Sequence, residues 1–89
     1  MNCILQWGYK TNAKAGGVDN SNNTNTFTFP VALKTVYACF AIFHVSAGNN
    51  NRDVTTNLLA ISTQSVSIRC LDSQNAGTDG NLYYGVIGV

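Results

Sequence analysis

Residues 36–45 are the feature that most constrains the fold, because they read as a β-strand with apolar side chains on both faces. Successive side chains of a strand point to opposite faces, so Phe40 and Ile42 share one face while Cys39 and Phe43 share the other. In a chain of 89 residues, one face can meet the internal core, but little sequence remains to cover the second. We therefore expect another copy of the same chain to cover that second face.

Strand-like alternation also occurs elsewhere in the chain. Phe27 and Phe29 alternate with Thr26 and Thr28, which is the pattern of a strand buried on one side only. No stretch has the i, i+3, i+4 apolar spacing of an amphipathic helix. We predict strands at residues 3–9, 24–29, 36–45, 58–62, 65–70 and 82–89. The prediction is an all-β fold, a six-stranded antiparallel β-sandwich that assembles as a homotrimer.

Residues that favour turns separate these strands. Asn, Asp, Ser and Gly are frequent in residues 11–25, 48–53 and 72–81, which we predict to be loops. Pro30 marks a corner between two strands, since proline lacks a backbone N–H. Only Thr63 and Gln64 separate two predicted strands, which therefore form a tight hairpin, although neither residue is the Gly or Asn that such a turn prefers.

Charge is scarce in this sequence. Charged residues make up 10% of the chain against about 25% in ordinary soluble domains, and the net charge is +1. A chain of this kind carries no electrostatic footprint for nucleic acid. No run approaches the roughly 20 apolar residues of a membrane-spanning helix, and the start lacks the features of a signal peptide. We expect no nucleic-acid partner, no membrane insertion and no export signal.

The three cysteines, Cys3, Cys39 and Cys70, are odd in number and lack the spacing of a metal site. Each stands in an apolar, strand-like run, so we expect buried reduced thiols, with a disulfide within or between chains as the alternative.

The candidates for catalysis are few. His44 is the single histidine, and no nucleophile motif accompanies it. It shares a strand face with Phe40 and Ile42, which favours a hydrogen-bonded place in the core or on a trimer axis; three copies holding a metal or anion there is a further alternative. All four carboxylates, which are Asp19, Asp53, Asp72 and Asp79, fall in predicted loops, where nothing raises a pKa for general acid catalysis. We predict no enzyme activity, no cofactor and no resident metal.

Four motifs, taken in order, resemble the C-terminal domain at the tips of phage and prophage tail fibres. These are Gln6-Trp7-Gly8, the run from Thr26 to Leu33, Tyr37-Ala38-Cys39-Phe40 and the ending from Tyr83 to Gly88. The chain departs from the family at Gly85, where a bulkier residue is common.

The resemblance implies a homotrimer at the distal end of a fibre, similar in architecture to the H-type lectins. Residues 1–89 would be a single domain and a fragment of a longer fibre protein, joined to an upstream fibre shaft. The implied location is the virion tail fibre tip, assembled in the bacterial host cytoplasm. The expected trimer interface contains Tyr37, Phe40, Ile42 and His44.

A glycan is the ligand that these polar loops suit best. Sugar recognition needs planar side chains with several donors and acceptors, together with an aromatic face. The expected contacts come from two loops and the strand after them: Asn50, Asn51, Arg52, Asp53, Asp72, Gln74, Asn75, Asp79, Asn81 and Tyr83. Trp7 alternates with Leu5 and Tyr9, which favours a place in the core or an interface over a sugar platform.

The sequence therefore predicts a non-catalytic, trimeric tip domain that binds a host-surface glycan such as lipopolysaccharide or capsule. One alternative is a purely structural trimerisation cap of the fibre. The other is part of a carbohydrate-degrading tailspike, which would place two carboxylates about 5–10 Å apart in a cleft.

Overall fold

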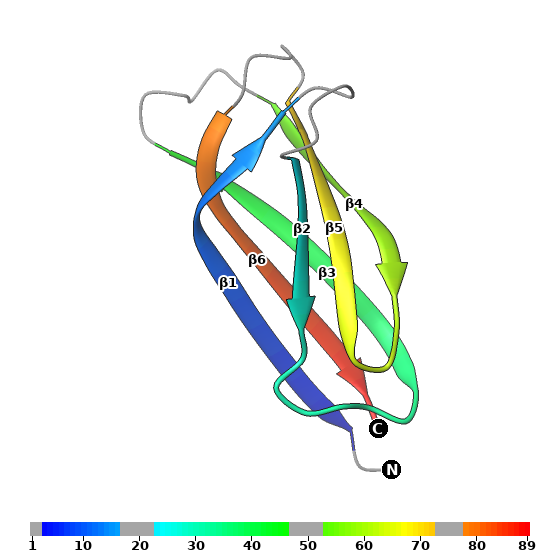
Figure 1. Ribbon diagram of the computed structural model, residues 1–89. Helices are drawn as coiled ribbons and strands as arrows, with labels where there is room; N and C mark the ends of the chain where they lie inside the picture. The colour runs from blue at the N-terminus through cyan, green and yellow to red at the C-terminus, as the bar shows by residue number, and fades with distance from the viewer. Residues whose placement is uncertain (1–2, 17–22, 47–52, 73–77) are drawn as a thin grey trace.

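A computed structural model describes residues 3–16, 23–46, 53–72 and 78–89 of the chain (Figure 1). These residues form two three-stranded antiparallel sheets, in the orders β1-β6-β3 and β2-β5-β4. The strands are β1 (Ile4–Ala15), β2 (Thr24–Thr28), β3 (Val36–Val45), β4 (Val54–Ile61), β5 (Ser65–Asp72) and β6 (Thr78–Gly88). The predicted six-stranded antiparallel β-sandwich is confirmed.

The core lies between the two sheets, on the inner faces of their central strands. Val66 and Ile68 of β5 and Leu82 and Val86 of β6 are fully buried. Between them the ring of Tyr84 lies across the core, 4.7 Å from the Phe27 ring centroid and tilted by 35°. The alternation predicted for residues 65–70 is therefore correct, because its apolar members face β6 across the sandwich.

Strand β3 has only one covered face. Cys39, Ala41 and Phe43 pack against the core, whereas Phe40 and Ile42 are exposed on the opposite side. The strand is apolar on both faces, as its sequence indicates, and its own chain covers only the inner one.

A β-bulge corrects the alternation expected at the start of β3. The sequence places Tyr37 on the inner face with Cys39, but the pairing with β6 shifts by one residue between Val36 and Ala38. As a result Val36 packs inward, while Tyr37 and Ala38 are both exposed. An extra residue on one strand reverses the side-chain alternation beyond it.

Strand β1 is longer than predicted, since it runs on through part of the predicted loop 11–25 to Ala15. A second bulge lies between Lys10 and Ala13, where Asn12 adopts a left-handed backbone with φ 54°. Asparagine tolerates this conformation better than most residues. Because the bulge reverses the alternation, Ala13 and Ala15 become fully buried, and their small size gave no strand signal in the sequence.

The bulge bends β1 so that its end reaches the other sheet (Figure 1). The Gly16 N–H donates to the Cys70 carbonyl at 3.2 Å, and the Asp72 N–H donates to the Gly16 carbonyl at 3.0 Å. The end of β1 thus takes the edge of β5 beyond Thr24, where β2 begins. This contact closes one side of the sandwich.

Two other strands begin earlier than the sequence suggests. β4 begins at Val54 rather than Leu58, and β6 begins at Thr78 rather than Leu82. Apart from Val54, the early residues are polar or glycine, so they carry little hydrophobic periodicity, but their backbones pair with a neighbouring strand. Asp72 and Asp79 therefore lie in strands and not in a loop, and Asp72 is buried.

The predicted hairpin at Thr63–Gln64 is confirmed, and Ser62 explains how it forms without glycine or asparagine. The Ser62 Oγ accepts hydrogen bonds from the Gln64 N–H at 3.1 Å and the Ser65 N–H at 3.0 Å. A serine hydroxyl can stabilise a turn in this way. The Ser62 N–H also donates to the Ser65 carbonyl at 2.9 Å.

All three cysteines lie in the described part of the chain and all are free thiols, so the disulfide within the chain is excluded. Cys70 is buried, Cys39 is half-buried and Cys3 is exposed, so the burial predicted for Cys3 is wrong. Cys3 precedes β1 at the end of the molecule, where no strand covers it. Within the described residues, no helix has the length and apolar character needed to cross a bilayer.

Candidate functional site

The outer face of the β1-β6-β3 sheet carries a regular grid of apolar side chains. Antiparallel pairing places three residues in each row across the sheet, one from each strand. The rows are Leu5-Ile87-Ala38, Trp7-Gly85-Phe40 and Tyr9-Tyr83-Ile42. We call these nine residues the apolar face.

Large side chains of the apolar face are open to solvent. The exposed fraction is 71% for Trp7, 65% for Tyr9, 62% for Ile42 and 49% for Phe40. None of the nine residues carries a charge at neutral pH. Extended apolar patches of this kind are uncommon on monomeric soluble proteins, where they mark interaction sites.

The departure at Gly85 has a packing role. A Cβ added at Gly85 would overlap the ring of Phe40, which therefore lies against the bare backbone of β6. The Tyr9 and Tyr83 rings meet in the next row, with centroids 5.9 Å apart and planes tilted by 31°. Residues of the apolar face therefore already pack against one another within one chain, although their large side chains remain exposed to solvent.

The residues predicted for the trimer interface are all exposed. Phe40 and Ile42 belong to the apolar face. His44 follows them on the same side of β3, and Tyr37 lies near the opposite end of that strand. The alternatives that placed His44 or Trp7 in the core are wrong, because both side chains point away from it. Their place in a trimer interface stays a prediction.

An open groove of about 330 Å³ borders the apolar face near the start of β1. Ile4, Leu5, Gln6, Trp7, Pro30 and Val31 line it. The Gln6 amide fixes the position of the far wall, because its Nε2 donates to the Val31 carbonyl and its Oε1 accepts from the Val31 N–H, both at 2.7 Å. Sequence reasoning did not identify the groove, although Gln6, Pro30 and Val31 all lie in the family motifs.

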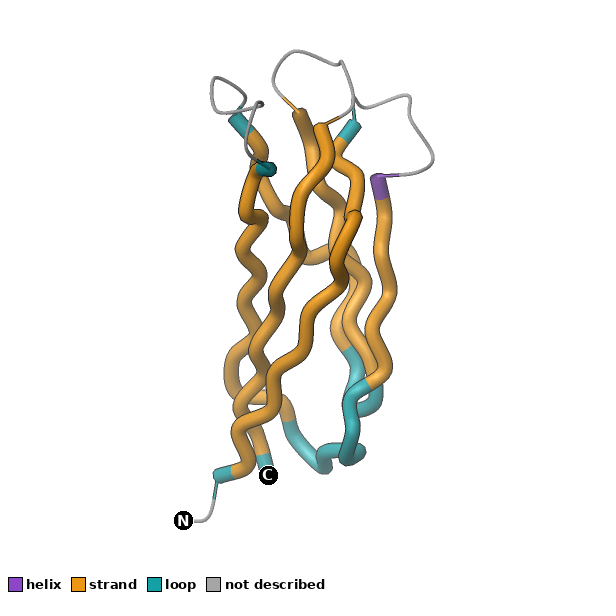
Figure 2. Tube along the Cα trace, turned by 90° about the vertical axis from the view of Figure 1, so that its left-hand side faces the viewer, coloured by secondary structure: helices purple, strands orange, loops and turns teal. Residues whose placement is uncertain are grey.

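The ends of the strands that flank the loops 47–52 and 73–77 meet at one pole, opposite the chain termini (Figure 2). The Ser46 N–H donates to the Asp79 carbonyl at 3.0 Å, and Asp72 pairs with Val54 across the β5-β4 ladder. Asp53 and Asp79 are exposed there, whereas Asp72 is buried. Of the predicted glycan contacts, Asn50, Asn51, Arg52, Gln74 and Asn75 lie outside the described residues, as does Asp19.

Two predicted glycan contacts lie away from this pole. Tyr83 belongs to the apolar face, beside Ile42, and Asn81 is in register with His44. The structure therefore brings Asn81 and Tyr83 together with the predicted trimer interface. No local pattern indicates this, because the pairing of β6 with β3 joins segments that are distant in the sequence.

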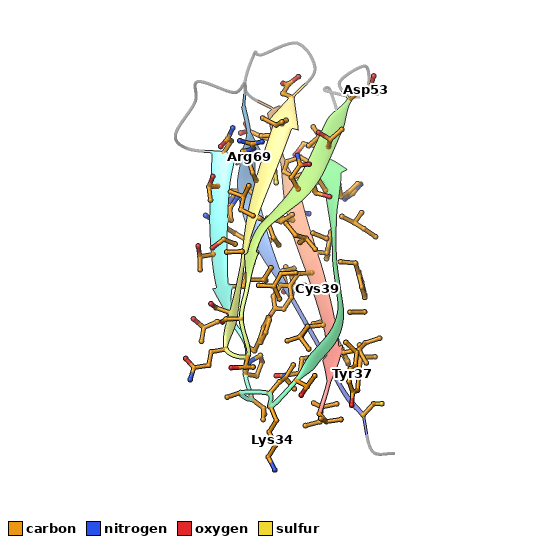
Figure 3. All side chains as sticks on the ribbon, turned by 90° about the vertical axis from the view of Figure 1, so that its right-hand side faces the viewer. Lys34, Tyr37, Cys39, Asp53 and Arg69 are labelled. Carbon is orange, nitrogen blue, oxygen red and sulfur yellow. The ribbon has the colours of Figure 1, made fainter. Side chains whose placement is uncertain are left out.

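Polar groups at two further positions were not anticipated. Lys10 Nζ donates to Asn25 Oδ1 at 2.9 Å and links the two sheets, while Asn25 Nδ2 is buried without a hydrogen-bond partner. Arg69 lies near the same pole as Asp53 (Figure 3), and its buried Nε also lacks a partner. Among the described residues, no group of three or more His, Cys, Asp or Glu side chains is placed to hold a metal ion.

Comparison with known proteins gives one family and several solved structures. The family described as "Putative tail fiber protein gp53-like, C-terminal" matches residues 2–89. An R2-type pyocin tail fibre has a TM-score of 0.69 at 20% identity, and a P. aeruginosa R1 pyocin fibre has 0.73 at 17%. Each match covers 98% of this chain, but only 30% and 23% of the respective fibre chains. No curated protein matches the sequence.

Proposed function

Because the chain belongs to the family of gp53-like tail fibre C-terminal domains, we propose that it is the distal, receptor-binding tip of a phage or prophage tail fibre. In this proposal the domain is a homotrimer joined to an upstream fibre shaft, and it sits at the fibre tip of the virion after assembly in the bacterial host cytoplasm. Its ligand is a host-surface glycan, and it carries out no catalysis.

The observation that carries the proposal is the uncharged apolar face. An aromatic side chain offers about 150–250 Å², so the exposed fractions on this face amount to roughly 700 Å². Each partner in a standard protein interface buries about 800 Å². A face of this size and composition supports burial against further copies of the chain.

The shape of the sheet suits a ring of three. Adjacent strands are about 4.8 Å apart and packed sheets about 10 Å apart, so three narrow sheets can enclose one axis with their outer faces inward. In that arrangement β6 of each subunit lies nearest the axis, and the Phe40 ring that packs over Gly85 faces it. The pole at which the strands flanking the loops 47–52 and 73–77 end is called the polar pole below. His44 and Asn81 then lie at the end of the same interface that is closer to this pole.

The polar pole is the proposed glycan site. It lies at the end of the molecule opposite the chain termini, and the exposed carboxylates of Asp53 and Asp79 accept hydrogen bonds from hydroxyl groups. The loops 47–52 and 73–77 join strand ends at this pole and carry the amide side chains that recognise sugars in such sites. In a trimer, Tyr83 belongs to the subunit interface rather than to the glycan site.

The proposal is tested in two measurements on the purified chain. Light scattering during size-exclusion chromatography should give the mass of three chains. Binding to arrayed bacterial glycans and to host cells should be lost or weakened in Arg52→Ala and Asp53→Ala, and kept in Thr28→Ala at the other end of the molecule. A trimer that binds no glycan would favour the structural cap, and release of sugars from capsule would favour a tailspike.

A further inference from the structure

We infer that the groove beside Trp7 receives Tyr37 of the neighbouring subunit, so that each chain in the ring locks into the next. This inference rests on the proposed trimer and names the contact that joins its subunits. It assigns an occupant to the groove and a specific partner to Tyr37, an aromatic side chain that its own chain leaves exposed.

The groove suits an aromatic side chain. Its walls are apolar, from Ile4, Leu5 and Trp7 on β1 and from Pro30 and Val31 opposite. The Gln6 amide already forms two hydrogen bonds with Val31, so a side chain in the groove need not supply a hydrogen-bond partner for it. Interfaces bury aromatic anchors in pockets of this type.

The occupant cannot be Tyr37 of the same chain. β1 and β3 are the two edges of their sheet, with β6 between them. At about 4.8 Å per strand step, these edges stand roughly 10 Å apart across the sheet. Tyr37 is also exposed, and it lies at the end of the molecule that holds Lys34 and the chain termini (Figure 3).

The sheet register places the groove and Tyr37 at the same height. Val36 and Ile4 both pair with Gly88, and Ala38 and Leu5 both pair with Ile87, so Tyr37 stands level with the Ile4–Leu5 wall of the groove. Rotation about an axis parallel to the strands leaves height unchanged. In a closed ring, the β3 edge of one subunit therefore meets the β1 edge of the next at matching levels.

The bulge in β3 turns Tyr37 away from the core, on the strand that forms this edge. Without it, the alternation would turn Tyr37 inward with Cys39. With it, Tyr37 and Ala38 are both exposed, and a large ring stands next to a small side chain. Bulges often re-aim a side chain for function. A cyclic trimer needs two different complementary patches on each chain, and the groove and Tyr37 provide them.

Cross-linking between two single variants tests the contact. Val31→Cys and Tyr37→Cys, each with Cys3→Ser, are co-expressed under different tags and treated with a short bismaleimide that spans about the length of a tyrosine side chain. Because each chain carries only one new cysteine, a linked dimer must join two subunits. We expect linked dimers in the mixture and in neither variant alone. Thr26→Cys replaces Val31→Cys in the control, since Thr26 lies on the outside of the other sheet.

Fluorescence gives a second readout, because Trp7 is the only tryptophan. In the trimer its emission should be that of a buried indole. Tyr37→Ala should shift that emission to the red and raise the dissociation concentration about 10- to 100-fold, while Tyr37→Phe keeps both near the wild type. These measurements decide the question even if the cysteine variants assemble poorly.

Each outcome separates this contact from the proposed trimer. A trimer without linked dimers, in which Trp7 is shielded regardless of residue 37, would show another occupant and overturn the contact alone. Linked dimers in an assembly of two chains would overturn the ring. A wild-type chain that stays monomeric would overturn the proposed trimer and this contact together.

Discussion

The outer faces of the two sheets differ in kind. On the β1-β6-β3 sheet, aromatic and aliphatic side chains form the apolar face. On the β2-β5-β4 sheet, the corresponding positions are mainly hydroxyl or polar: Thr24, Thr26, Thr28, Ser65, Ser67, Arg69, Asn57 and Thr55. The exposed apolar residues of this second sheet, Leu58, Leu59 and Ile61, lie on its edge strand β4. One side of the sandwich is therefore polar and the other apolar, which supports the proposal that a further copy of the chain covers the apolar side.

Because only 10% of its residues are charged, the chain relies on other side chains to interact with water. Hydroxyl groups solvate the polar side at little electrostatic cost, and Thr26 Oγ1 and Ser67 Oγ hydrogen bond across two strands at 2.9 Å. The apolar side gains nothing from water, so it contributes to stability only when it is covered. Substitutions on the two faces, and in the core beneath them, should therefore have different effects.

A carboxylate on the apolar face should abolish assembly. We expect Ile42→Glu to be monomeric at concentrations at which the wild type forms the proposed trimer, because burying each unpaired charge costs several kcal/mol. Ile42 is 62% exposed in the single chain, so the fold itself should persist. Light scattering and circular dichroism measure the two effects. Thr26→Glu on the polar face should remain trimeric, and equal loss of assembly in both variants would contradict the distinction between the faces.

The packing of Phe40 on Gly85 should make this position intolerant of a side chain. Gly85→Ala should lower the free energy of unfolding by about 1–3 kcal/mol, the usual cost of overpacking. Urea denaturation measures it.

Phe40→Ala removes the ring that the new methyl would meet. The double variant should therefore lose less stability than the sum of the two single changes. Strict additivity would mean that the Phe40 ring is not the obstacle.

Two threonines of the polar sheet should respond differently to the same substitution. Thr56 Oγ1 donates to the Ala41 carbonyl on β3 at 3.0 Å and is half-buried, so Thr56→Val should cost about 1 kcal/mol. Thr26 is exposed, so Thr26→Val should change stability by less than about 0.5 kcal/mol. Paired urea titrations check both values. A larger loss of stability in Thr26→Val would mean that the hydrogen bond between the Thr26 and Ser67 hydroxyl groups stabilises the fold.

The smallest expected effect is a pH dependence from Cys70, which lies on the inner side of the polar sheet. Burial raises the pKa of this thiol from 9.0 to about 11. Below pH 9.0 the Cys70 thiol is protonated in the folded and in the unfolded chain. Between pH 9.0 and about 11 it ionises mainly in the unfolded chain, so the free energy of unfolding should fall as the pH rises.

Stability measured between about pH 7.5 and 9.5 should show a slight decline that Cys70→Val reduces and Cys3→Ser keeps, because Cys3 is exposed. Cys39 accounts for the remainder, since burial raises the pKa of its half-buried thiol as well. The range stops below the ordinary pKa of Tyr84, which burial also raises. An unchanged decline in Cys70→Val would assign it to another group.

The amino-acid sequence was enough to locate all six strands, although not the end of β1 or the starts of β4 and β6. Away from bulges it also indicated which side chains share a face, because alternation is a local property of extended backbone. It therefore placed Val66 and Ile68 inside, Phe40 and Ile42 together, and the hairpin at Thr63–Gln64. It also supplied the family motifs.

Which strands lie side by side became clear only from the folded chain. The rows of the apolar face, the meeting of Tyr83 with Ile42 and the packing of Phe40 on Gly85 all depend on β6 pairing with both β1 and β3. Pairing joins segments distant in sequence and is selected by the whole core, which no local pattern records. The bulges at Tyr37 and Asn12 have the same origin, since each adjusts one strand to a partner that the sequence does not reveal.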